Sequence, residues 1–109
     1  MRRMDTLPPE IAEHLGEVRA LCEKYSVKRL TLFGSAVKGT FDPATSDVDF
    51  VVEFEWHPDP LERGRRWNHM WEELKDVFGR NIDLLVRSTI KNPYVIASIE
   101  LSHVDVYAA

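Results

Sequence analysis

The chain has 109 residues with 44% hydrophobic and 29% charged side chains, which suits a single folded domain over residues 1–109. Its formal net charge of −4 argues against stable nucleic-acid binding, which usually needs a basic face. One cysteine, Cys22, excludes an internal disulfide, and no apolar run suits a signal peptide or a membrane span, so we expect a cytoplasmic protein without membrane attachment.

The first predicted element is an amphipathic helix over residues 9–25. It follows a polar lead, residues 1–6, with Thr6 as a candidate cap and Pro8 and Pro9 suited to a first helical turn. We expect Cys22 to be a buried apolar residue, because it belongs to the core-facing stripe of this helix. That stripe consists of Ile11, Leu15, Val18, Leu21, Cys22 and Tyr25.

Two strands and a tight turn follow. The strands are predicted at Val27–Phe33 and Val48–Phe54, joined by Gly34-Ser35, a one-turn helix that ends at Gly39, and a loop. Because strand residues alternate between faces, Asp47 and Asp49 point the same way. The opposite, core-facing side carries Val48, Phe50, Val52 and Phe54.

Asp47 and Asp49 are a candidate metal site. Neighbouring carboxylates repel each other unless a cation lies between them, and a ligand set made only of oxygen favours Mg²⁺ or Mn²⁺. Gly34 and Ser35 are a candidate phosphate site, because a glycine turn before a helix presents backbone N–H groups and Ser35 adds a hydroxyl donor. Together these features indicate a site for a nucleotide–magnesium complex, although the sequence contains no Walker loop.

A loop and a second long helix come next. Trp56–Pro60 is predicted to be a loop, since Pro58 and Pro60 lack the N–H group that a strand needs. A helix is predicted over Leu61–Phe78, ending at Gly79. Its apolar stripe, expected to be core or, where exposed, a partner surface, consists of Trp67, Met70, Trp71, Leu74, Val77 and Phe78.

Several charged residues in this half allow two interpretations. Glu53 and Glu55 continue the face of the aspartates and are expected to be solvated. Arg63, Arg65 and Arg66 lie in the early turns of the second helix, where the macrodipole disfavours cations. A solvated face is the favoured interpretation for them, and an anionic ligand or an acidic partner is the alternative.

A third strand is predicted over Ile82–Arg87. Asp83 lies on its non-core face, where it could meet the aspartate pair of the preceding strand. Asn92-Pro93 then begins a last helix that runs to about Ser102, and residues 103–107 alternate as in a short edge strand.

These motifs resemble a known family. Gly34-Ser35-x-x-x-Gly39 followed by Ser46-Asp47-x-Asp49 is similar to the signature of the DNA polymerase beta-like nucleotidyltransferases, specifically the minimal nucleotidyltransferase (MNT) group. Asp83 matches the third acidic residue of that family. One extra residue lies between the two halves of the motif, and we place it in the Phe41–Thr45 loop, where insertion costs little. The resemblance implies an α/β (α+β) polymerase beta-like fold, with a small mixed sheet of three to four strands flanked by helices.

The resemblance also implies roles for the site residues. Asp47 and Asp49 would bridge two Mg²⁺ ions, with Asp83 as a further ligand and as the base. Gly34, Ser35 and Lys38 would hold the phosphates of ATP. The alternative is that the aspartates are unrelated surface carboxylates, but their order relative to Gly34-Ser35 favours a catalytic site.

The usual partner in the MNT family is a HEPN-domain toxin, an RNase, and some members attach AMP to a tyrosine of the toxin. We therefore interpret the chain as an MNT antitoxin and protein adenylyltransferase whose acceptor is presented from outside. The alternatives are an antitoxin that neutralises by binding alone and a small-molecule nucleotidyltransferase like those that modify aminoglycosides. The partner is expected near the mouth of the site, with Phe41–Thr45 and Arg63, Arg65 and Arg66 as candidate contacts.

Overall fold

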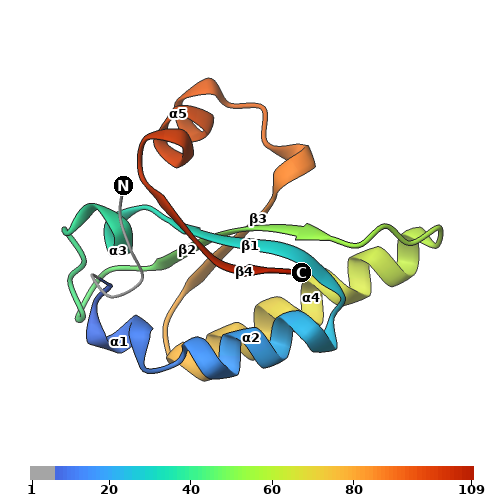
Figure 1. Ribbon diagram of the computed structural model, residues 1–109, viewed down its shortest axis with the longest axis horizontal. Coiled ribbons are helices and arrows are strands. Elements are labelled where there is room, and N and C mark those ends of the chain that lie inside the picture. Colours follow the sequence, from blue (N-terminus) through green and yellow to red (C-terminus); the bar gives the residue numbers. More distant parts are fainter. Residues whose placement is uncertain (1–6) are drawn as a thin grey trace.

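The computed structural model describes residues 7–109, so the polar lead and the candidate cap Thr6 lie outside the described residues. A four-stranded mixed sheet forms the centre of the molecule, in the order β3-β2-β1-β4 (Figure 1). Strand β1 pairs antiparallel with β2 and β4, and β2 pairs parallel with β3. The predicted α/β class with a mixed sheet is confirmed. The strands are β1 Val27–Phe33, β2 Val48–Phe54, β3 Ile82–Val86 and β4 His103–Ala108.

Helices cover both faces of the sheet. Two long helices, α2 and α4, lie below it in Figure 1, and α5 lies above it. None of the helices in residues 7–109 is long and apolar enough to cross a bilayer. In chain order the helical elements are α1 Pro9–Ala12, α2 Leu15–Lys24, α3 Ser35–Lys38, α4 Pro60–Phe78, the 3₁₀ turn η2 Arg87–Thr89 and α5 Pro93–Leu101.

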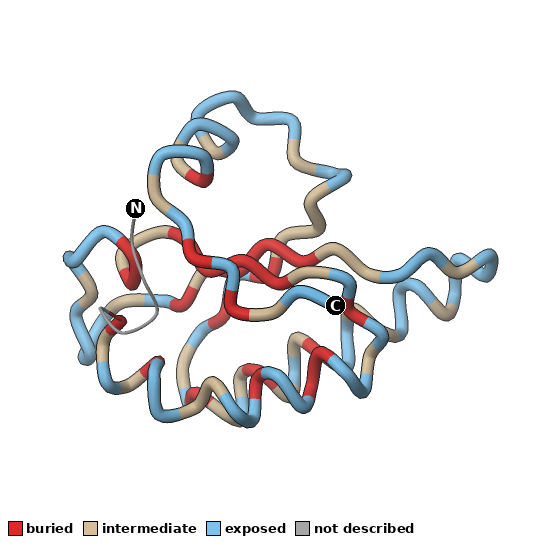
Figure 2. The backbone as a smooth tube through the Cα atoms, in the orientation of Figure 1, coloured by how far each residue is buried: buried red, intermediate tan, exposed pale blue. Residues whose placement is uncertain are grey.

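The main core lies between the sheet and the α2–α4 layer, where Figure 2 shows buried segments facing each other. As the alternation predicts, Val48, Phe50 and Val52 of β2 are fully buried on this side. Burial of each such side chain contributes about 1.5–3 kcal/mol. A second, smaller core lies under α5, where Ile99 packs against Phe33 and Val51. The non-core faces of β2 and β3 therefore point toward α5.

The N-terminal helix is not continuous, and the prediction of one helix over 9–25 is wrong in this respect. Helix α1 ends at Ala12, and α2 begins after His14. At the break, the His14 ring packs edge-on against Phe78 of α4 at 5.4 Å between centroids, a tertiary contact that sequence spacing does not reveal. The apolar stripe itself is correct. Cys22 is fully buried in it, and burial, aided by the charge of Glu23, raises the pKa of the Cys22 thiol to about 12.

The two tryptophans of α4 cover the outer edge of β3. Their rings stack at 5.8 Å between centroids, and their indole N–H groups donate to β3 carbonyls, Trp67 to Leu84 at 2.9 Å and Trp71 to Ile82 at 2.8 Å. An open strand edge invites pairing with other chains. Because the indoles occupy these carbonyls, the tryptophans belong to the structure of the domain and block that edge.

The charged residues at the far end of β2 form more ion pairs and hydrogen bonds than the sequence predicted. Glu53 is half-buried between Arg29, at 2.8 Å, and Arg87, at 3.6 Å, so the expectation of a solvated carboxylate is wrong. Two of the arginines in α4 hold the preceding loop: Arg63 donates to the carbonyl of residue 57 at 2.6 Å, and Arg66 to that of residue 55 at 3.2 Å. Arg63 and Arg65 are nevertheless exposed, as the favoured interpretation predicts, whereas the Arg66 side chain is largely covered.

Candidate active site

The parallel pairing of β2 and β3 brings two of the predicted site residues together. Asp49 and Asp83 are direct partners in the strand register, and both project from the non-core face. Their side chains are hydrogen-bonded to each other, and Asp47 is near enough for its charge to act on Asp49. Asp83 lies more than thirty positions after Asp47 and Asp49 in the sequence. The β2–α4–β3 crossover brings the three residues together.

Asp49 sits in an environment that resists its ionisation. Burial, the hydrogen bond to Asp83 and the charges of Asp83 and Asp47 together raise the pKa of Asp49 to about 7, and the nearby Lys38 only partly opposes them. The raised pKa of Asp49 means that the buried carboxylate lacks sufficient positive charge nearby. Such a site favours a cation that can replace the proton.

The turn between β1 and α3 fits closely over this pair. Gly34 has φ 76° and ψ −151°, a region that is essentially restricted to glycine. A Cβ atom added at Gly34 would overlap the carboxylate of Asp49. Gly34 is therefore required for two reasons: the backbone conformation and the space that the Asp49 side chain occupies.

Ser35 and Lys38 lie on α3 beside the same carboxylates. Ser35 begins the helix, where backbone N–H groups have no partner within the helix itself. The ammonium group of Lys38 donates to the Ser98 hydroxyl on α5 at 3.1 Å, and its charge favours the ionised form of Asp49. The structure thus places all the predicted site residues around one point, between α3, α5 and the starts of β2 and β3. Their roles in binding remain predictions.

The metal prediction requires a fit between the donors and the ion. In residues 7–109, no three acidic, histidine or cysteine side chains are gathered closely enough to form a ready-made metal site. The donor set nevertheless suits a hard cation: three carboxylates, two of them joined by a hydrogen bond and the third, Asp47, exposed. Mg²⁺ bound beside Asp49 would replace the proton that the raised pKa of Asp49 retains, with Asp47 and Asp83 as further carboxylate ligands.

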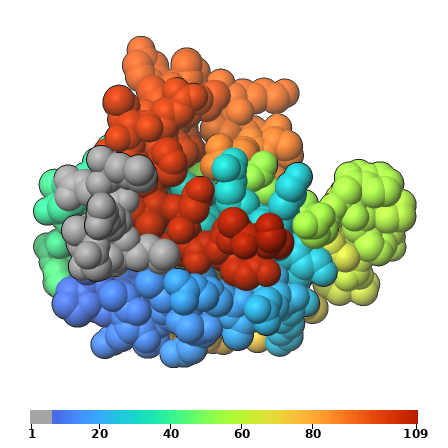
Figure 3. Space-filling model, in the orientation of Figure 1, coloured from blue at the N-terminus to red at the C-terminus, as the bar shows by residue number. Residues whose placement is uncertain are grey.

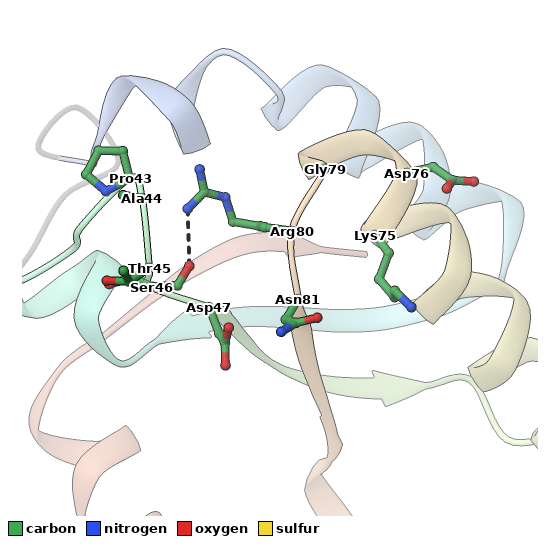
Figure 4. A pocket seen from close by; sticks show the side chains of 10 residues that line it. All are labelled: Pro43, Ala44, Thr45, Ser46, Asp47, Lys75, Asp76, Gly79, Arg80 and Asn81. Carbon is green, nitrogen blue, oxygen red and sulfur yellow. Dashed lines mark hydrogen bonds between the residues drawn. The ribbon is translucent and has the colours of Figure 1, made fainter.

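Two residues at this end of the sheet received no role from the sequence. Arg80 donates to the carbonyl of Ser46 at 3.1 Å (Figure 4). The carbonyl of Asn81 accepts from the N–H of Val48 at 3.1 Å. They border a polar cavity of about 510 Å³ that reaches Asp47 and the end of α4. The one feature of the sequence that could have indicated a role for Arg80 and Asn81 is their position just before the strand that carries Asp83.

The environment of Asp49 predicts an unusual pH dependence of stability in the metal-free protein. Because the folded protein holds the Asp49 proton up to about pH 7, the contribution of this group to stability is full below about pH 4, is lost as the pH rises from about 4 to 7, and is level above that. Asp49→Asn should remove this fall and raise the free energy of unfolding at pH 8 by about 1–2 kcal/mol after allowance for solvent screening. Urea denaturation with a chelator at pH 5 and pH 8 measures the effect. Asp76→Asn, at an exposed position on α4, is the control; an unchanged pH slope in Asp49→Asn would contradict the prediction.

Comparison with known proteins identifies relatives over most of the chain. The family described as nucleotidyltransferase domain matches residues 18–106. A Methanocaldococcus jannaschii protein provisionally named as a protein adenylyltransferase, MJ0128, is 38% identical over 82 residues, which are 75% of this chain and 79% of the relative. Protein adenylyltransferase MntA of Thermococcus cleftensis is 29% identical over 92 residues, 84% of this chain and 85% of the relative.

Solved structures with the same fold come from toxin–antitoxin systems. A toxin–antitoxin crystal structure with AMP-PNP has a TM-score of 0.64 at 16% identity, covering 87% of this chain and 73% of that one. A structure of a tri-AMPylated Shewanella oneidensis HEPN toxin with its MNT antitoxin has a TM-score of 0.56 at 14% identity, covering 89% of this chain and 71% of that one. At these identities the likeness shows the fold.

Proposed function

This chain belongs to the nucleotidyltransferase domain family and is a nucleotidyltransferase, and from that premise we propose that it is an MNT antitoxin that transfers AMP from ATP to a tyrosine of a cognate HEPN toxin. The observation that carries the proposal is the pairing of Asp49 with Asp83 directly beneath the glycine turn of Gly34. Such an arrangement would join a cation site and backbone donors for phosphate within one domain, which we take as residues 1–109.

The residues divide the work of the reaction between them. Asp47, Asp49 and Asp83 would hold two Mg²⁺ ions, which supply positive charge against the triphosphate and ease deprotonation of the attacking hydroxyl. The N–H groups of the turn after Gly34, together with the Ser35 hydroxyl, would donate hydrogen bonds to the β- and γ-phosphates. Lys38, already next to Asp49, would add a positive charge on the same side.

The proposed transfer is an in-line displacement. The tyrosine oxygen forms a bond to the α-phosphorus of ATP, the bond from that phosphorus to the β-phosphate oxygen breaks, and pyrophosphate leaves. The tyrosine proton passes to the Asp83 carboxylate, which is exposed at the mouth of the site. Catalysis on this pathway is mainly positioning and charge neutralisation.

The acceptor must approach from a side that the described residues leave open. The loop 42–45 is fully exposed and runs directly into Asp47, so it supports the predicted partner surface. The arginines of α4 lie elsewhere: their loop protrudes from the opposite end of the molecule (Figure 3), at the far end of β2 from the aspartates. We therefore place the acceptor contact at the 42–45 loop and not at Arg63, Arg65 or Arg66.

Co-expression with the cognate HEPN protein tests this function. We expect the wild-type chain to restore growth and to add one or more AMP units to the toxin, measured as a mass gain on a tyrosine-containing peptide. The isolated chain should turn over ATP only slowly, because water is not oriented for in-line attack. Omission of Mg²⁺ from the purified reaction should abolish the mass gain.

A matched pair of variants separates enzyme from binding module. Asp83→Asn alters the proposed base, and Asp76→Asn makes the same chemical change on the exposed side of α4. Loss of both rescue and mass gain in Asp83→Asn alone supports the proposal. Rescue by both variants with no mass gain in any sample would instead identify an antitoxin that acts by binding.

A further inference from the structure

The loop that precedes Asp47 is organised around its own Asp42. The N–H of Ala44 donates to the Asp42 carboxylate at 2.9 Å, and Asp42 and Ser46 are joined by two further bonds of 2.8 Å each. The Ala44 bond and a second one from the Thr45 side chain hold the pKa of the Asp42 carboxylate below its ordinary value. The 41–47 loop is therefore a closed turn. It includes residues 41–45, where we placed the one extra residue relative to the MNT motif.

Packing does little to hold this loop against the rest of the protein. Residues 42–45 are exposed, and the polar cavity of about 510 Å³ separates the loop from the end of α4 (Figure 4). Arg80 crosses this space. Its guanidinium lies 4.9 Å from the centre of the Phe41 ring and donates to the Ser46 carbonyl, so one side chain holds both ends of the loop.

The contacts of Arg80 and its neighbour enclose one catalytic residue. The Ser46 carbonyl belongs to the peptide group before Asp47, and the Val48 N–H belongs to the peptide group after it. Arg80 binds the first, and the Asn81 carbonyl binds the second. Since the two peptide groups that flank a residue define its backbone dihedrals, residues 80 and 81 determine the direction in which Asp47 points.

The same two residues begin the segment that carries the other acid. Asn81 is followed by Ile82 and Asp83 at the start of β3. The cross-link through Arg80 therefore joins the two segments that must present carboxylates to a common ion. The Asp47 carboxylate itself points away from Arg80 in Figure 4, so the guanidinium does not neutralise it.

We propose that Arg80 is a positioning residue for nucleotide transfer: through the Ser46 carbonyl and the Phe41 ring it holds Asp47 in the orientation that a divalent cation with ATP requires. Arg80 acts through the loop and does not touch the reacting atoms. The inference rests on the proposed function, in particular on Asp47 as a cation ligand. On this inference Arg80, just before β3, holds in place the loop that contains the extra residue.

Binding of Mn²⁺ in the presence of ATP, followed by the electron paramagnetic resonance signal of free Mn²⁺, tests this in the isolated full chain. Arg80→Met keeps the length of the side chain but removes the guanidinium, and we expect Mn²⁺ affinity to fall about 10-fold. Arg80→Lys keeps a donor for the Ser46 carbonyl and should recover part of that loss. Arg65→Met, at the opposite end of the molecule, is the matched control and should bind as the wild type does.

Transfer kinetics provide the second readout. In Arg80→Met the Mg²⁺ concentration for half-maximal rate should rise about 10-fold, while KM for the acceptor stays unchanged, a split that general destabilisation would not produce. Wild-type Mn²⁺ affinity in Arg80→Met, with an unchanged Mg²⁺ requirement, would overturn the inference and leave the proposed function standing. Failure of the wild-type chain itself to bind Mn²⁺ with ATP would overturn both.

Discussion

Replacing Asp47 and Asp49 together by asparagine should lower the rate of nucleotide transfer by at least about 10³-fold. Asparagine preserves the shape of each side chain but removes the negative charge that a divalent cation needs. The fold should survive, because Asp47 is exposed and Asp49 is already held in its uncharged form over much of the pH range. Mass measurement of the modified acceptor after incubation with ATP and Mg²⁺ gives the rate.

The change in stability distinguishes a lost site from a lost fold. The double variant should melt at or above the wild-type temperature without metal, and Mg²⁺–ATP should stabilise only the wild type. Full transfer by the double variant, or equal stabilisation of both proteins by Mg²⁺–ATP, would show that these aspartates are not the cation site.

Gly34→Ala should be the most damaging single methyl addition in the chain. The new Cβ would overlap the Asp49 carboxylate, and the positive φ of this residue is strained for alanine. We expect the free energy of unfolding to fall by about 3 kcal/mol or more and nucleotide binding to be lost, because either Asp49 or the turn must move. Urea denaturation and calorimetric titration with Mg²⁺–ATP measure the two effects.

Two other substitutions provide the comparison. Gly64→Ala places a methyl group where nothing lies within 4 Å, in the interior of α4, and should stabilise the protein by about 1 kcal/mol. Ser35→Ala leaves the turn intact and removes one hydroxyl donor, so nucleotide affinity should fall by about 1–3 kcal/mol while stability stays close to that of the wild type. Wild-type nucleotide affinity in both Gly34→Ala and Ser35→Ala would contradict the phosphate site.

Local patterns predicted most of the secondary structure. Period-two alternation located β1, β2 and β4, and the cap-plus-proline pattern at Asn92-Pro93 correctly located the start of α5, where the Asn92 side chain accepts from the Tyr94 N–H at 2.9 Å. These features depend on neighbours in the chain, which is why they can be read from it. The continuous N-terminal helix failed because its break coincides with a contact to Phe78, more than sixty residues away.

The long charged and aromatic side chains were the least predictable. Glu53 and Arg66 were assigned to solvent, yet both are partly buried and find partners across a strand or a loop. Trp67 and Trp71 pack against the core as predicted, but the sequence did not show that their indoles also cover a strand edge. Such side chains reach several ångströms from the backbone, so their partners depend on which segments lie nearby in space.

The sequence by itself determined the chemical inventory of the site: the aspartates at 47, 49 and 83, the turn at Gly34, and the faces on which they lie. Periodicity carries this information because side-chain direction in a strand is a local property. The tertiary structure alone decided that Asp83 is the register partner of Asp49, that Gly34 must lack a side chain because Asp49 fills its space, and that Arg80 holds the loop before Asp47. Each of these depends on contacts between segments that are distant in the chain, and such contacts exist only once the sheet has formed.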